Sequence, residues 1–160
     1  MAKNNGEGIV FFGILVGLIL YIAKLIYDQS VKPKLNARAA TRKLDKLPDG
    51  KEMLTRLRNK LTILSPESVD IPITPSNEAY TIGKKQIFLC FLDEKGLPYD
   101  ENTILYAAIH ELAHVITPTY DEHGPDFREN FQKLLDRAAY LGLLYPGTPI
   151  HPQYCQFNKK

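Results

Sequence analysis

The sequence contains only two cysteines, Cys90 and Cys155, among its 160 residues. Two cysteines are too few for a disulfide framework or a four-cysteine zinc site, so both of these small-domain classes are excluded. Cys90 lies within an apolar run and is expected to be a buried small hydrophobic residue. The glycosylation pattern Asn-x-Ser/Thr is also absent, which is consistent with a domain that does not enter the secretory lumen.

The chain also lacks a strong charge of one sign, because its formal net charge is only +2. The charges are unevenly divided, however: residues 24–60 carry 11 Lys/Arg against 4 Asp/Glu, and residues 61–160 carry 8 against 13. No aromatic residue lies between positions 28 and 60 to stack on bases, so nucleic acid ranks last among the expected partners. Residues 32–60 are expected either to show a solvated basic face or to contact anionic lipid headgroups.

One stretch is long and apolar. Residues 9–23 contain no charged side chain, and residues 25–27 continue the stretch beyond Lys24, whose ammonium can reach the interface. At 1.5 Å per residue, a helix of this length spans a hydrocarbon core of roughly 30 Å. We therefore predict a tail at residues 1–8 and a transmembrane helix at residues 9–27. A cleaved signal peptide is the competing interpretation, but no small-residue cleavage site follows the run.

Basic residues follow the apolar run, whereas only Lys3 precedes it. The positive-inside rule then predicts that the C-terminal domain is cytosolic or lies inside a virion. Gly13 and Gly17 form a GxxxG pattern that can pack transmembrane helices together. Homo-oligomers or virion assembly are therefore among the expected partners of the membrane segment.

Residues 28–64 are predicted to be a basic juxtamembrane segment with two helices, separated by Pro48-Asp49-Gly50. Asp49 and Glu52 have the spacing of a capping box at the start of the second helix. Residues 65–76 contain three prolines and are expected to form an extended loop. This loop begins a domain predicted at residues 65–150, and residues 151–160 are expected to be a surface tail.

The first part of this domain is predicted to form a β-hairpin. Residues 79–82 and 86–92 are rich in β-branched, aromatic and other apolar side chains, and a glycine turn separates them. The second run is apolar on both faces, so we expect it to be the inner strand. Asp100 is a plausible N-cap for an amphipathic helix from about Asn102 to Val115. The predicted fold class is therefore α+β.

The candidate site lies at the end of that helix, in the sequence HELAH at positions 110–114. Side chains four residues apart share a helix face, so His110 and His114 can bind one Zn²⁺. Glu111 projects beside that pair and could act as general base for a metal-activated water. His123 is the candidate third ligand, because the following Gly124 and Pro125 are expected to start the next helix and hold it at the helix entrance.

His110-Glu111-Leu112-Ala113-His114, followed by His123-Gly124-Pro125-Asp126-Phe127, resembles the SprT-like and WLM-type zinc metallopeptidases. The resemblance covers at most residues 79–142. It implies that the three histidines are zinc ligands, that Glu111 is the general base, and that the domain is a minimal zincin of the gluzincin type. It also implies an edge strand that holds an extended peptide. Small members occur in large DNA viruses, so a viral membrane or virion protein is the expected setting.

The expected function is thus that of a membrane-anchored, zinc-dependent metalloprotease that hydrolyses peptide bonds of a protein or peptide substrate. The alternative is a catalytically silent zinc-binding structural protein of a membrane or virion. No residue is predicted to bind a further cofactor. His151 and Cys155 are weaker candidates, as an additional ligand or an inhibitory thiol. Tyr106 and Tyr120 could donate a hydrogen bond to an oxyanion.

Overall fold

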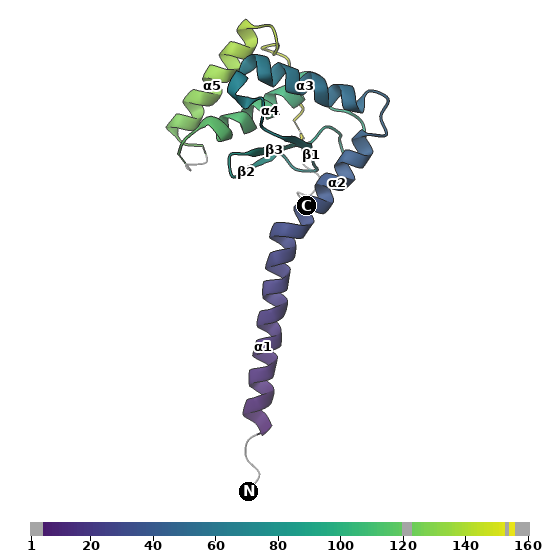
Figure 1. Ribbon diagram of the computed structural model, residues 1–160, viewed down its shortest axis with the longest axis vertical. Helices are drawn as coiled ribbons and strands as arrows, with labels where there is room; N and C mark the ends of the chain where they lie inside the picture. The colour runs from purple at the N-terminus through teal and green to yellow at the C-terminus, as the bar shows by residue number, and fades with distance from the viewer. Residues whose placement is uncertain (1–4, 120–122, 153, 156–160) are drawn as a thin grey trace. The chain divides into compact units, whose positions relative to one another are not determined.

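The computed structural model describes residues 5–119, 123–152 and 154–155. It is a mixed α+β structure with an apolar N-terminal helix, as the sequence predicted, and its small sheet has three strands where the sequence predicted a hairpin (Figure 1). The chain divides into two compact units, residues 1–36 and residues 37–160. The predicted boundary at residue 65 therefore lies inside the second unit.

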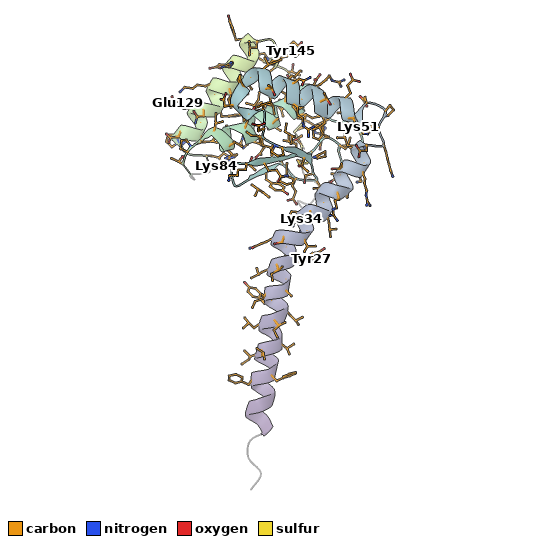
Figure 2. The ribbon with its side chains drawn as sticks, viewed as in Figure 1. Tyr27, Lys34, Lys51, Lys84, Glu129 and Tyr145 are labelled. Carbon is orange, nitrogen blue, oxygen red and sulfur yellow. A yellow bond between two sulfur atoms is a disulfide. The ribbon has the colours of Figure 1, made fainter. Side chains whose placement is uncertain are left out.

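The first unit contains α1 (Asn5–Ile26), a π-helix (Tyr27–Val31) and the start of α2 (Lys32–Leu44). Every side chain from Phe11 to Ile26 is exposed, and Figure 2 shows them projecting on all sides of the helix. Apolar side chains all round a helix with no protein cover are typical of a membrane span. By length and composition, this helix is suited to cross a membrane.

In the second unit, α3 (Gly50–Leu64) follows α2 after a short turn. A Cβ atom at Gly50 would overlap the Leu44 carbonyl, so only glycine allows this close approach of the two helices. Asp49 occupies the N-cap position, but its side chain makes no cap hydrogen bond, so the predicted capping box is wrong. Helix α3 buries Leu57, Leu61 and Leu64 in the core.

The sheet has the strand order β1-β3-β2, with bounds Ile73–Pro75, Tyr80–Ile82 and Gln86–Leu89 for β1, β2 and β3. The antiparallel pair β2–β3 confirms the predicted hairpin and its inner strand. The prediction of a loop at residues 65–76 was wrong, because Pro66–Ser68 forms a 3₁₀ helix and β1 pairs parallel with β3. Pro75 fits there because β1 is an edge strand, where a missing N–H donor costs no ladder hydrogen bond.

Two long helices complete the unit. In α4 (Glu101–Ile116) the Asp100 side chain accepts a hydrogen bond from the Thr103 N–H, which confirms the predicted N-cap. In α5 (Pro125–Tyr140) the proline occupies the first turn, as predicted, and Gly142 follows with a φ of 66°. The central residues of α4, including Leu105, Ala108 and Leu112, are completely buried. Core packing therefore fixes the position of the helix that carries the site.

The segment from residue 151 onward was predicted to be a surface tail, and His151 and Pro152 are indeed exposed, but Tyr154 and Cys155 pack against the core. A disulfide joins Cys155 to Cys90, with their Cα atoms 5.7 Å apart. The Tyr154 hydroxyl donates to the Cys90 carbonyl at 3.0 Å, and the His151 N–H donates to the Thr103 hydroxyl. Cys90 is buried as predicted. The bond itself was not predicted, because 65 residues separate the two cysteines and no local pattern brings them together.

Cys155→Ser is expected to lower the free energy of unfolding by up to about 4 kcal/mol under oxidising conditions. The disulfide closes a long loop, with a separation of 65 residues, and removes much of the unfolded chain's entropy. Denaturant unfolding of wild type and variant, each with and without dithiothreitol, measures the effect. The reductant should destabilise wild type and leave the variant unchanged. Equal stabilities without reductant would show that the disulfide does not stabilise the fold.

Candidate metal centre

Two of the three predicted ligands lie on the last turns of α4. His110 and His114 are half-buried, and their Nε2 atoms are 3.3 Å apart. The four-residue spacing places both imidazoles on one face of the helix. Because α4 is held by its buried apolar face, these two nitrogens have a fixed separation.

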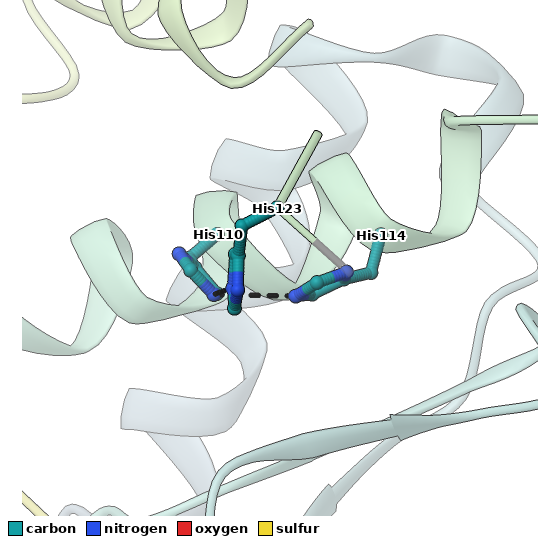
Figure 3. A group of neighbouring side chains, drawn as sticks. All are labelled: His110, His114 and His123. Atoms are coloured by element: carbon teal, nitrogen blue, oxygen red, sulfur yellow. Dashed lines mark hydrogen bonds between the residues drawn. The ribbon is translucent and has the colours of Figure 1, made fainter. Parts of the chain in front are cut away.

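The third predicted ligand, His123, comes from the segment directly before α5. Its Nε2 lies 3.2 Å from that of His110, and the three ligand atoms lie within 4.8 Å of one another. Figure 3 shows the three rings turned toward one another. Nitrogens bound to zinc at 2.0–2.1 Å in a tetrahedral geometry lie about 3.3–3.4 Å apart. The distances from His110 to His114 and to His123 match this spacing, so the cluster could hold a metal ion.

An aromatic side chain packs against the three histidine rings. Phe127, on the first turn of α5, is only 3% exposed, and its ring centroid lies 4.3 Å from that of His114 and 4.8 Å from that of His123. It also contacts His110 at 5.0 Å. The sequence did not reveal that Phe127 contacts all three imidazoles. Its ring excludes water from one side of the cluster and limits the rotamers of the histidines.

Glu111 is buried, with 6% of its surface exposed, beside the same cluster. The Thr81 hydroxyl of β2 lies 2.9 Å from its Oε2 and 3.1 Å from its backbone carbonyl, so it can donate to either. Burial raises the pKa of the Glu111 carboxyl to about 7, although the Thr81 hydrogen bond opposes this shift. A carboxyl that titrates near neutral pH is suited to take up and release a proton.

The His110 imidazole responds to burial in the opposite direction. Its pKa is lowered to about 4, first by burial and then by the neighbouring His114 and His123. His110 is therefore neutral at pH 7, with a nitrogen lone pair available for a metal ion.

These groups open onto one cleft of about 470 Å³ between the hairpin and the helices. Tyr80 and Thr81 of β2 line it on one side, and Glu111, His114 and Phe127 line it on the other. The edge strand and the histidine cluster thus share a single cavity. The arrangement combines three convergent nitrogen donors, a buried carboxyl and space for a ligand.

The weaker candidate residues either make other contacts or lie outside the residues that the structure describes. His151 packs edge-on against Tyr99 and is not part of the histidine cluster, and Cys155 is in the disulfide. Tyr106 packs its ring edge-on against Phe131. Tyr120 lies outside the described residues. Two contacts of the site were not predicted, Thr81 with Glu111 and Lys84 with the segment after α4, because neither has a sequence signal.

Glu111→Gln is expected to stabilise the metal-free protein at alkaline pH. With its raised pKa, folded Glu111 binds its proton more tightly than the unfolded chain, so stability is full below about pH 4.5 and falls as pH rises through about 7. A shift of this size corresponds to roughly 3 kcal/mol at most. Urea unfolding after chelation should show no advantage of the variant at pH 4 and its full advantage at pH 8. An advantage that does not change with pH would contradict the assignment.

The structure thus defines a mixed α+β protein with an apolar N-terminal helix and a three-histidine cluster that could hold a metal ion. Its sequence relatives are viral. It is 28% identical to uncharacterized protein 136R of Invertebrate iridescent virus 6 over 178 aligned positions, which cover 93% of this chain and 98% of the relative. It is 37% identical to uncharacterized protein 042R of Invertebrate iridescent virus 3 over 87 positions, or 54% of each chain.

A third relative is uncharacterized protein R325 of Acanthamoeba polyphaga mimivirus, 35% identical over 83 positions that cover 48% of this chain and 41% of the relative. No family model and no solved structure matches the chain. The similarity to viral proteins supports a viral origin. Because these relatives are uncharacterized, they carry no information on the chemistry of the site.

Proposed function

We propose that this chain is a membrane-anchored, zinc-dependent metallopeptidase of the SprT-like or WLM type, with a minimal zincin domain. The observation that carries the proposal is the convergence of the His110, His114 and His123 nitrogens beside the buried Glu111 carboxyl. Three imidazoles whose nitrogens converge on one point suit Zn²⁺, and three protein ligands leave a position open for catalysis.

In the proposed reaction, the three histidines hold the metal and Phe127 keeps their rings in place. The bound zinc ion would supply a Lewis acid that polarises water and the substrate carbonyl. Glu111 takes a proton from the attacking water on its carboxylate and passes it to the leaving amine. The Thr81 hydroxyl, which lies within hydrogen-bond distance of Oε2, keeps that carboxylate in one orientation.

The proposed substrate is an extended peptide. Strand β2 is at the edge of the sheet and lines the cleft through Tyr80 and Thr81. An edge strand offers backbone N–H and C=O groups to which an extended chain can add. A peptide bound along β2 would pass the histidine cluster, because both face the same cavity.

Helix α1 is the proposed membrane anchor, with the second unit inside the virion or in the cytosol. The lysines and arginines after α1 support this orientation. The Cys90–Cys155 disulfide favours an oxidising environment, so a reducing cytosol suits this unit less well. Anionic lipid contact is proposed for the basic residues before α3. Two basic residues of α3 are used within the protein: Arg58 donates a hydrogen bond to the Ile73 carbonyl, and Lys60 donates one to the Leu143 carbonyl.

The test uses the full chain in detergent micelles, with metal content and cleavage measured on the same preparation. The expected result is one zinc ion per chain and cleavage of an unfolded reporter protein that stops on chelation and returns with Zn²⁺. The matched control is the His110→Ala, His114→Ala double variant, which should lose both properties. Bound zinc without cleavage would support the structural scaffold instead, and no bound metal would reject both.

A further inference from the structure

Lys84 joins the β2–β3 turn to the segment that follows α4. Its ammonium donates hydrogen bonds to three consecutive backbone carbonyls, those of Thr117, Pro118 (2.8 Å) and Thr119 (2.9 Å). Figure 2 labels Lys84 at the hairpin. An ammonium group has three N–H donors, so it can serve one carbonyl with each. Three acceptors on one cation fix the direction in which the chain leaves α4.

The backbone at Lys84 adds a second observation. The turn is closed by the Lys85 N–H, which donates to the Ile82 carbonyl at 3.0 Å, and its central residues Gly83 and Lys84 have φ values of 55° and 57°. Glycine adopts this left-handed conformation without cost, whereas a lysine is strained in it. The turn itself therefore gives no reason for a lysine at this position, and the contacts of its side chain do.

The segment that Lys84 holds leads to the third histidine. Residues 117–119 directly follow α4, and His123 is four positions further along the chain. From the other side, the Asn130 amide of α5 donates to the Thr117 hydroxyl at 3.1 Å. His110 and His114 sit on the rigid α4, so the path of this segment decides whether His123 reaches them.

We propose that Lys84 is a positioning residue for the metal centre: by binding the three carbonyls after α4, it holds the connecting segment so that His123 completes the cluster. This inference rests on the metal centre of the proposed function. Lys84 acts through His123 and does not itself bind the metal ion.

The chain offers a matched control in the adjacent Lys85. It has the same charge in the same turn, but its side chain is exposed, whereas that of Lys84 is half-buried. Lys84→Met keeps most of the alkyl chain and removes the donors. Lys84→Gly also removes the ammonium donors, and glycine adopts the positive φ without strain. This variant therefore tests the side-chain contacts separately from backbone strain.

The measurement is the zinc affinity of the full chain in detergent micelles, from competition with a chromophoric chelator. Lys84→Met and Lys84→Gly are expected to weaken zinc binding roughly tenfold, the scale at which residues that orient ligands act. Lys85→Met should stay within about twofold of wild type, since an exposed surface side chain has little effect. Lys84→Arg should restore most of the affinity, because guanidinium also donates to several acceptors.

A double-mutant cycle shows whether Lys84 acts through His123. In a His123→Ala background, Lys84→Met should cause no further loss of affinity, because the ligand that it positions is gone. A tenfold loss in both backgrounds would indicate general damage to the site and overturn the inference. Unchanged affinity of both Lys84 variants would overturn it and leave the metal centre intact. Absence of zinc binding by wild type would overturn both proposals together.

Discussion

Glu111→Gln is expected to lower cleavage of an unfolded protein by about 10²–10⁴-fold and to leave one zinc ion bound per chain. Glutamine has nearly the same shape, and its side-chain oxygen can still accept the Thr81 hydrogen bond that Glu111 accepts at 2.9 Å. It cannot take up a proton from water at neutral pH. The substitution therefore removes proton transfer while it preserves the packing around the histidines.

The measurement compares initial rates of reporter cleavage and zinc content for wild type and Glu111→Gln. Glu129→Gln is the matched control, because Glu129 is an exposed residue of α5 that pairs with Lys133 at the surface. The control should retain both cleavage and zinc. Undiminished cleavage by Glu111→Gln would remove Glu111 from the mechanism. Loss of zinc from that variant would assign Glu111 to holding the metal centre together.

His123→Ala is expected to weaken zinc binding by at least about 100-fold. Residues that merely orient a metal ligand cost 10–100-fold when replaced, so removal of a direct ligand should exceed that range. The His123 Nε2 lies 3.2 Å from that of His110. When His123 is replaced by alanine, only the His110 and His114 imidazoles of the cluster remain. Two nitrogen ligands are fewer than the three that catalytic zinc sites use.

The zinc affinity of the variant is measured by the same chelator competition, with His151→Ala as the control. His151 packs against Tyr99 and lies outside the cluster, so its replacement should leave zinc affinity within about twofold. Normal zinc content of His123→Ala would point to another third ligand. A matching loss in His151→Ala would show that His151 contributes to the site.

Local patterns in the sequence were sufficient for much of the fold. The apolar run before Lys24, the Asp100 N-cap and the proline at the start of α5 each depend on interactions within one or two helical turns. The same holds for the pair His110 and His114, because helix geometry alone puts them on one face. These features needed no knowledge of distant residues.

Long-range pairing produced the errors. Strand β1 was missed because its three residues form a strand only when they pair with β3, and the prolines around it favoured a loop. The packing of Tyr154 and Cys155 on the core was missed because Cys90, the partner of Cys155, lies 65 residues earlier. Parallel pairing and disulfides join segments that no local pattern connects.

The sequence by itself determined the donor types of the site: two histidines one helical turn apart, a glutamate between them, and a third histidine before a helix start. Only the tertiary structure decided that the third nitrogen comes within 3.2 Å of the first, that Glu111 is buried against Thr81, and that Lys84 holds the connecting segment. The physical reason is that α4 carries two ligands on one rigid element, whereas the position of His123 depends on contacts between the hairpin, α4 and α5.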